Sequence, residues 1–279
     1  MDMKDNKTGT SSKRVRHIIA LSGGKDSSAL AVYMRGKIPN VEYVFCDTEK
    51  ELDETYEYLI KLEAYLGKKI YYLKSSGYGF DDILQLKRGF LPSAESRWCT
   101  EYLKIKPFEE YIGDDPVINY VGIRADELHR EGYISTKPNV KTVFPFIEDN
   151  IRREDVLRIL QDSGLGLPRY YEWRSRSGCY FCFFQQKREW VGLLENHPDL
   201  FEKAKAYEKF DPITGERYTW MQDESLDELS RPERIAEIKA EYEKRKSRQA
   251  KAFKGNQKLR ELWMTNDFEE DIPCTICRL

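Results

Sequence analysis

The sequence lacks the features that mark several large classes of protein. No stretch approaches the roughly 18 consecutive apolar residues of a membrane span. Residues 1–14 are polar and contain no apolar signal-peptide segment, so we expect a cytoplasmic protein that does not enter the membrane. The 46 Lys and Arg nearly balance the 48 Asp and Glu, and a net charge of -2 gives no global attraction to a polyanionic partner.

Cysteine is also scarce. Six cysteines are poor material for a disulfide framework in a reducing compartment. Four of them form two Cys-x-x-Cys pairs, a spacing that indicates metal or redox chemistry. What the sequence does contain, 40% hydrophobic residues over 279 positions, is enough for one or two folded cores.

Short β-branched or apolar runs alternate with helix-like stretches along the first half of the chain. The expected strands are residues 15–21, 41–46, 69–73 and 117–121, and the expected helices are residues 27–35, 51–66, 102–112 and 152–163. This alternation predicts an α/β fold, a parallel sheet with helices on both faces.

The pattern changes after residue 168. Aromatic residues, Arg and Cys are dense in residues 169–190, and charged helical stretches are expected near 198–210 and 231–263. We therefore expect a polar tail (1–13), an α/β nucleotide-binding domain (14–168) and a smaller helical, cysteine-containing subdomain (169–279).

The strongest motif directly follows the first expected strand and precedes a helix. It consists of Ser22, Gly23, Gly24, Lys25, Asp26, Ser27 and Ser28. Two glycines let the backbone pass close to a ligand, and the helix start offers unpaired N–H groups and the positive end of a dipole. The loop predicts an anion cradle that is neither a Walker loop nor a Gly-x-Gly-x-x-Gly loop. The structural alternative is a Gly-Gly turn with an Asp or Ser helix cap.

The motif resembles the PP-loop, Ser-Gly-Gly-x-Asp-Ser, of the adenine-nucleotide alpha-hydrolase superfamily, whose members bind ATP or an adenylyl compound. The resemblance implies a Rossmann-like sheet in which Lys25 neutralises phosphate charge and Asp26 caps the helix or orients the loop. The phosphates would be held by Ser22, Gly23, Gly24, Ser27 and Ser28. We expect ATP to bind with Mg²⁺ as counter-ion.

Three further segments resemble the phosphoadenylyl-sulfate reductase family, so that the likeness covers about residues 15–182. Residues 47–55 are similar to its Asp-Thr-Gly…Glu-Thr stretch, with Glu49 in place of glycine. Residues 122–130 are similar to its Gly-Ile-Arg-x-x-Glu-Ser-x-Arg, and residues 144–156 to a helix entry that we take as structural.

This likeness extends the predicted nucleotide site. It places Asp47, Thr48 and Gly122 at the nucleotide and implies that Arg124 binds a phosphate or sulfate, acting with Lys25 and Asp26 in catalysis. The alternatives are an exposed turn at residues 47–48 and a surface salt bridge of Arg124.

The cysteines continue the resemblance. Cys99 occupies the first of the tandem cysteine positions of iron–sulfur adenylyl-sulfate reductases, with Thr100 at the second, and Cys179 and Cys182 match a later Gly-Cys-x-x-Cys. The resemblance implies a [4Fe–4S] cluster whose fourth ligand is Cys274 or Cys277. Zinc on the two Cys-x-x-Cys pairs, and metal-free cysteines, remain alternatives. Cys46, within an apolar strand, is expected to fill the core.

The resemblance breaks at the C-terminus, where the reductases carry a Glu-Cys-Gly-x-His tail. No such tail is present, and no histidine of this chain replaces it. We therefore expect cleavage of ATP at the α-phosphate to activate a substrate, in sulfur transfer. The alternatives are sulfonucleotide reduction and a non-catalytic ATP-binding subunit of a nucleic-acid modification or defence complex.

The stretch after Ala236 is locally basic, with Phe253 and Trp263 nearby, which suits a nucleic acid, although a solvated helix explains it equally well. The partners considered are an adenine nucleotide, a nucleic acid, a partner protein and a second copy of the chain.

Overall fold

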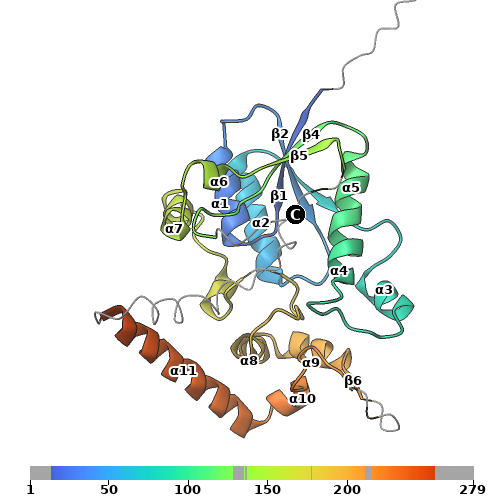
Figure 1. Ribbon diagram of the computed structural model, residues 1–279, viewed down its shortest axis with the longest axis vertical. Coiled ribbons are helices and arrows are strands. Elements are labelled where there is room, and N and C mark those ends of the chain that lie inside the picture. Colours follow the sequence, from blue (N-terminus) through green and yellow to red (C-terminus); the bar gives the residue numbers. More distant parts are fainter. Residues whose placement is uncertain are drawn as a thin grey trace, which may run out of the picture.

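Five parallel strands form the sheet at the centre of the fold (Figure 1). The computed structural model describes residues 14–127, 135, 137–176, 178–210, 215 and 217–254. The strand order is β3-β2-β1-β4-β5, and every neighbouring pair is parallel. The bounds are β1 (Arg16–Leu21), β2 (Val41–Cys46), β3 (Ile70–Leu73), β4 (Val117–Tyr120) and β5 (Val140–Val143). The predicted parallel α/β fold is confirmed.

Helices cover both faces of this sheet. The helical elements of residues 14–168 are α1 (Lys25–Met34), α2 (Asp53–Leu66), α3 (Phe80–Leu86), α4 (Trp98–Thr100), the π-helical turn η1 (Glu101–Ile105), α5 (Lys106–Ile112), α6 (Pro145–Glu148) and α7 (Arg153–Asp162). Ile19 of β1 packs in a cluster with residues of α1, α2 and α7, whereas Ile18 packs in another with residues of α5. Both isoleucines are fully buried. A strand covered on both faces needs a continuous apolar run, as β1 has.

The chain order reverses at β1, which pairs with β2 on one side and β4 on the other. In open parallel sheets, ligands bind beyond the carboxyl ends of the strands at such a reversal. Residues 22–28, 47–48 and 122–124 follow β1, β2 and β4, so the predicted nucleotide segments share this edge of the sheet.

The predicted strands are close to those observed. Residues 41–46 have the predicted bounds, and the other three predicted strands each differ by one residue at one end. Strand β5 was not predicted, because it is a four-residue edge strand in which Lys141 and Thr142 interrupt the apolar pattern.

The C-terminal part is mainly helical, as predicted. It comprises the 3₁₀ turn η2 (Arg169–Glu172), α8 (Lys187–Asn196), α9 (Pro198–Ala206), β6 (Lys209–Phe210), β7 (Arg217–Tyr218), α10 (Leu226–Leu229) and α11 (Pro232–Lys254). The helix predicted at 198–210 ends early, because Lys209 and Phe210 pair with β7 in an antiparallel hairpin. Residues 255–263 of the last predicted helix lie outside the described residues.

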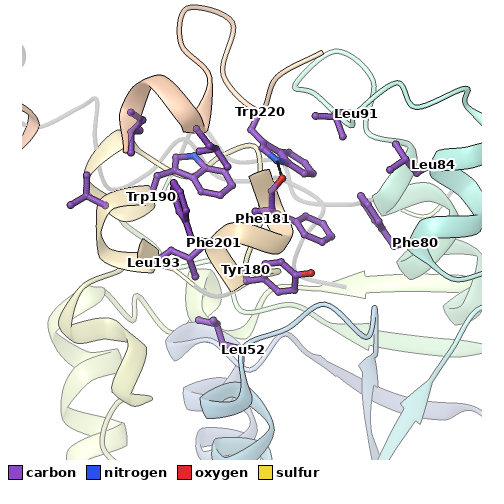
Figure 2. Close-up of a cluster of buried hydrophobic side chains, with 14 of the residues drawn as sticks. Leu52, Phe80, Leu84, Leu91, Tyr180, Phe181, Trp190, Leu193, Phe201 and Trp220 are labelled. Atoms are coloured by element: carbon purple, nitrogen blue, oxygen red, sulfur yellow. Dashed lines mark hydrogen bonds between the residues drawn. The ribbon is translucent and has the colours of Figure 1, made fainter. Parts of the chain in front are cut away.

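One aromatic cluster joins the C-terminal part to the sheet domain (Figure 2). Phe181 stacks on Trp220 with ring centroids 5.0 Å apart, and Phe80 of α3 lies 4.3 Å from Phe181 by the same measure. Leu52, which precedes α2, belongs to the same cluster. The domain division at residue 168 stays a prediction, and a shared hydrophobic core crosses it.

Within the described ranges, no helix combines the length and the apolar composition needed to cross a membrane. The predicted tail, residues 1–13, lies outside them.

Candidate functional site

Serine side chains close the loop between β1 and α1 on itself. The Ser22 amide donates to Ser27 Oγ at 3.1 Å, and the two serine hydroxyls lie 3.0 Å apart. Ser27 Oγ also donates to the carbonyl oxygen of Gly24 at 3.3 Å. Residues 22–27 therefore wrap around the start of α1, where backbone N–H groups and the helix dipole favour an anion.

Gly23 is required by the loop's geometry. Its φ of +71° lies in the left-handed region, and a Cβ at this position would lie 2.5 Å from Thr55 Cγ2 on α2. The backbone at Gly122 also packs closely against the start of α1, since a Cβ there would lie 3.0 Å from the carbonyl oxygen of Asp26. The two glycines let the ends of β1 and β4 pack tightly against their neighbours.

Two tyrosines from the C-terminal part hold the loop from outside. The Tyr170 hydroxyl donates to the carbonyl oxygen of Gly23 at 2.8 Å, and the Tyr171 hydroxyl accepts from the Lys25 amide at 3.0 Å. Lys25 Nζ lies 5.4 Å from the centroid of the Tyr171 ring. Burial raises the pKa of Tyr170 well above its ordinary value, so its hydroxyl stays a donor. The sequence analysis missed these tyrosines, and the aromatic density of residues 169–190 was the only signal.

Arg124 lies at the centre of a buried network of charges. Its guanidinium is 3.0 Å from Asp26 Oδ1, 3.0 Å from Asp126 Oδ1 and 3.6 Å from Glu127 Oε1. Its side chain is 2% exposed, and that of Asp26 is 3% exposed. Burial lowers the pKa of Arg124, but the negative charges of Asp26 and Glu127 raise it by a larger amount. The net shift of the pKa is upward, so the guanidinium stays charged.

These contacts give Arg124 a positioning role that the sequence analysis did not include. It anchors Asp26, in the first turn of α1, to the segment that follows β4. Its contact with a phosphate or sulfate stays a prediction. Leu128, which stands where the family pattern has Ser, lies outside the described residues.

The end of β2 faces the Cys-x-x-Cys segment. Thr48 Oγ1 donates to Glu51 Oε1 at 3.1 Å and lies 3.2 Å from Cys179 Sγ. Asp47 Oδ1 accepts from the Tyr56 hydroxyl at 2.7 Å. Glu51 and Cys179 also form an isolated antiparallel bridge. The predicted nucleotide contacts of Asp47 and Thr48 stay predictions.

Cys182 lies within electrostatic range of both Cys99 and Cys179. Burial raises the pKa of Cys99 to about 11, and the Cys182 thiol adds to this effect. Burial also raises the pKa of Cys179 well above its ordinary value, with Glu51 as the next cause. Both thiols are therefore neutral at pH 7 unless a metal cation displaces their protons.

The ligand set for a metal is incomplete in the described part of the chain. Among these residues, no three His, Cys, Asp or Glu side chains form a group that could hold a metal ion. Cys274 and Cys277, one of which was predicted to complete the set, lie outside the described residues.

Lys104 is a buried cation that the sequence analysis did not single out. It lies in the π-helical turn η1 and is 8% exposed. Burial lowers its pKa, but Glu51 and then Cys179 raise it, and the net shift is upward. Cys46 fills the core as predicted, 3% exposed, with its thiol donating to the Lys104 carbonyl oxygen at 3.4 Å. A π-helical turn, frequent at functional sites, has no simple sequence signature.

The fold and the loop together define a class, an α/β protein with a glycine- and serine-containing loop at the switch point of its parallel sheet. Residues 16–183 match the phosphoadenosine phosphosulfate reductase domain, and the chain belongs to this family.

The curated relatives are themselves uncharacterised. Two proteins of Methanocaldococcus jannaschii are 27% and 28% identical over 67% and 66% of this chain, which spans only 40% and 45% of their lengths. A 37.8 kDa protein of Escherichia phage 186 is 25% identical over 69% of this chain and 74% of its own length.

Solved structures with a similar fold are more distant. A phosphoadenylyl-sulfate reductase from Candida auris is 13% identical with a TM-score of 0.46, covering 59% of this chain and 81% of its own. A U34-tRNA thiolase from Methanococcus maripaludis with its [4Fe-4S] cluster is 16% identical with a TM-score of 0.40, covering 70% of this chain and 72% of its own.

Proposed function

We propose that the protein binds ATP with Mg²⁺ at residues 22–28 and cleaves it at the α-phosphate to activate a substrate in sulfur transfer. The observation that carries this proposal is the loop itself. Its serines close it around the start of α1, and Tyr170 and Tyr171 hold it from outside. Membership of a family that uses adenine nucleotides supports the choice of ligand.

The proposed reaction has two displacements. An oxygen of the substrate attacks the α-phosphorus, the bond to the β-phosphate oxygen breaks, and pyrophosphate leaves with that electron pair. A sulfur or nitrogen nucleophile then displaces AMP from the activated carbon. Loop N–H groups and Lys25 would hold the phosphates, while Arg124 fixes Asp26 in the first turn of α1.

We also propose a metal centre held by Cys99, Cys179, Cys182 and one of the terminal cysteines Cys274 and Cys277. It is supported by Cys182, which lies within electrostatic range of both Cys99 and Cys179, and by the Cys-x-x-Cys spacing of Cys179 and Cys182. With four thiolate ligands, a [4Fe–4S] cluster there would supply a redox group, and zinc would supply a structural link between distant segments. No step of the reaction above depends on it.

The test combines calorimetry with ATP and an assay of pyrophosphate release. Gly24→Val places a side chain at the loop and should weaken ATP binding at least tenfold. Arg124→Ala should lower turnover by roughly five- to 150-fold, the range of about 1–3 kcal/mol for charge-assisted hydrogen bonds. Arg158→Ala is the matched control, because that guanidinium is 68% exposed and pairs only with Asp155 in the described chain.

Three outcomes would contradict the proposal. Wild-type affinity in Gly24→Val would remove the loop from the site. Turnover of adenylyl sulfate without pyrophosphate release from ATP would favour the reductase. ATP binding with no turnover would favour the non-catalytic subunit. Arg124→Lys keeps the buried charge but not the planar fork, so it separates a catalytic effect from misfolding.

A further inference from the structure

A pocket lined mainly by cations lies between the start of α8 and the middle of α11, and its volume is about 500 Å³. Its cationic lining residues are Lys187, Arg188, Lys244, Arg245 and Arg248, whereas Glu241 is its single carboxylate. We propose that this α8–α11 pocket binds the phosphate backbone of a single-stranded nucleic acid, with one base stacked on Arg188 and Tyr242. The inference rests on the proposed function, for which it names the substrate class.

Much of the positive charge in the pocket is not neutralised by the protein. Lys187 pairs with Asp223 and Glu224 and is therefore neutralised. Lys244 and Arg248, by contrast, are exposed and form no ion pair with any residue in the described part of the chain. The ion pairs recorded for α11 involve Arg234 and Lys239, on other positions of the helix. A solvated helix with internally matched charges does not account for this arrangement.

Two guanidinium groups in the pocket repel each other. Burial and the like charge of Arg188 lower the pKa of Arg245. A phosphate between the two groups would relieve this repulsion, and its oxygens accept the paired N–H donors of guanidinium. The dipole of α8 adds to the attraction, because the helix contributes its first residues to the pocket.

The spacing on α11 suits an extended chain of phosphates. Tyr242, Arg245 and Arg248 lie three residues apart on α11 and line the same pocket, together with Lys244. Residues three apart on an α-helix are turned by about 60° from one another, so these side chains wind around α11 while lining one pocket, and a backbone that follows them would meet successive cations. The balanced net charge of -2 is therefore compatible with a local nucleic-acid site.

A stack of a cation on an aromatic ring distinguishes a nucleic acid from an acidic peptide. The guanidinium carbon of Arg188 lies 4.5 Å from the centroid of the Tyr242 ring. Unpaired bases stack on tyrosine rings and on guanidinium planes, whereas an acidic peptide has no use for such a platform. The volume of about 500 Å³ is in the range of pockets that hold a small organic ligand such as one nucleotide.

The test is fluorescence anisotropy of the full chain with a labelled single-stranded oligonucleotide, between 50 and 200 mM salt and without ATP. Arg245→Ala combined with Arg248→Ala should weaken binding at least tenfold. It should also reduce the slope of log Kd against log salt by about 1.4, since each phosphate contact to a single strand contributes about 0.7. Tyr242→Ala should weaken binding by about tenfold with an unchanged slope.

The matched control is Lys239→Ala combined with Lys246→Ala, which removes the same charge from the same helix outside the pocket lining. It should change the affinity less than twofold. Equal losses in the two double variants, or no binding by the wild type at 50 mM salt, would overturn the proposal. Binding of duplex as tight as that of the single strand would also overturn it. Polyglutamate that competes as well as the unlabelled oligonucleotide would overturn it too, and would favour an acidic protein as the partner.

Circular dichroism checks that each variant is folded. Because ATP is absent, the result is independent of the proposed ATP cleavage. If the pocket does not bind the oligonucleotide, the proposal that residues 22–28 bind ATP is unaffected. If ATP does not bind, the oligonucleotide titration still tests the pocket.

Discussion

At the scale of single residues, Gly23 carries two separate constraints. Its left-handed φ of +71° disfavours any side chain, and Thr55 Cγ2 occupies the space where a Cβ would lie. Gly67 shares the first constraint, with φ +64°, but has nothing within 4 Å of its Cβ position. The pair therefore separates backbone strain from steric overlap.

We expect Gly23→Ala to destabilise the fold by about 1–3 kcal/mol more than Gly67→Ala, as overpacking does, and to weaken ATP binding. Thr55→Ser, added to Gly23→Ala, removes Cγ2 and should recover most of the difference in stability between Gly23→Ala and Gly67→Ala. Urea unfolding and calorimetry with ATP measure the two effects. Equal losses in the two alanine variants, with no recovery by Thr55→Ser, would show that contact with Thr55 does not shape the loop.

At the scale of elements, Glu189 fixes the start of α8. Its side chain is 0% exposed, and Oε2 accepts from the Gln186 amide at 3.0 Å. Oε1 accepts from the amide and the hydroxyl of Ser175 at 2.7 Å and 2.6 Å. Burial raises the pKa of Glu189, but Arg174 and these hydrogen bonds outweigh it, and the net pKa lies below the ordinary 4.5.

A carboxylate with a lowered pKa stabilises the fold above its unfolded pKa, and this stability is lost as the pH falls through the folded value. Glu189→Ala should therefore reduce the free energy of unfolding at pH 7 by about 2–4 kcal/mol, because buried donors lose their acceptor. The loss should shrink below pH 4.5. Glu195 also lies on α8, in an exposed ion pair with Lys239 of α11, and Glu195→Ala should change stability by less than about 1 kcal/mol. Thermal and urea unfolding from pH 3 to 7 give both values, and a Glu189 effect that is independent of pH would refute this account.

The elements that the sequence predicts well are those whose own residues determine them. The apolar run of β1 and the Gly-Gly-Lys-Asp start of α1 carry their structure locally, and both were placed within two residues. The start of α8 depends on Ser175 and Glu189, and the loop contacts of Tyr170 and Tyr171 span about 146 residues. Such contacts leave no periodic pattern, so the sequence did not predict them.

At the scale of the whole molecule, the cysteines predict a metal centre that links segments distant in the sequence. Cys99 lies before α5, Cys179 and Cys182 precede α8, and the terminal pair follows α11. Structural metal sites contribute roughly 10–16 kcal/mol, comparable with the 5–15 kcal/mol that stabilise a whole domain, so loss of a ligand should destabilise the C-terminal part.

Metal analysis of anaerobically purified Cys99→Ser, Cys274→Ser and Cys277→Ser decides between the two centres. A cluster should lose iron in Cys99→Ser and in one terminal variant, with the other terminal variant as the internal control. Zinc on the paired motifs should be lost from both terminal variants and kept in Cys99→Ser. Full metal content in all three variants would leave only structural cysteines.

The contact of Tyr170 and Tyr171 with residues 23 and 25 also has a consequence for synthesis of the chain. Residues 22–28 leave the ribosome early, and β1 can pair with β2 once residue 46 has emerged. Their neighbour β4 follows about seventy residues later, and the tyrosines later still. Contacts of such large sequence separation form slowly. A nascent chain stalled before residue 170 should therefore carry residues 22–28 without the two tyrosine contacts, and the proposed binding of ATP should arise late in translation.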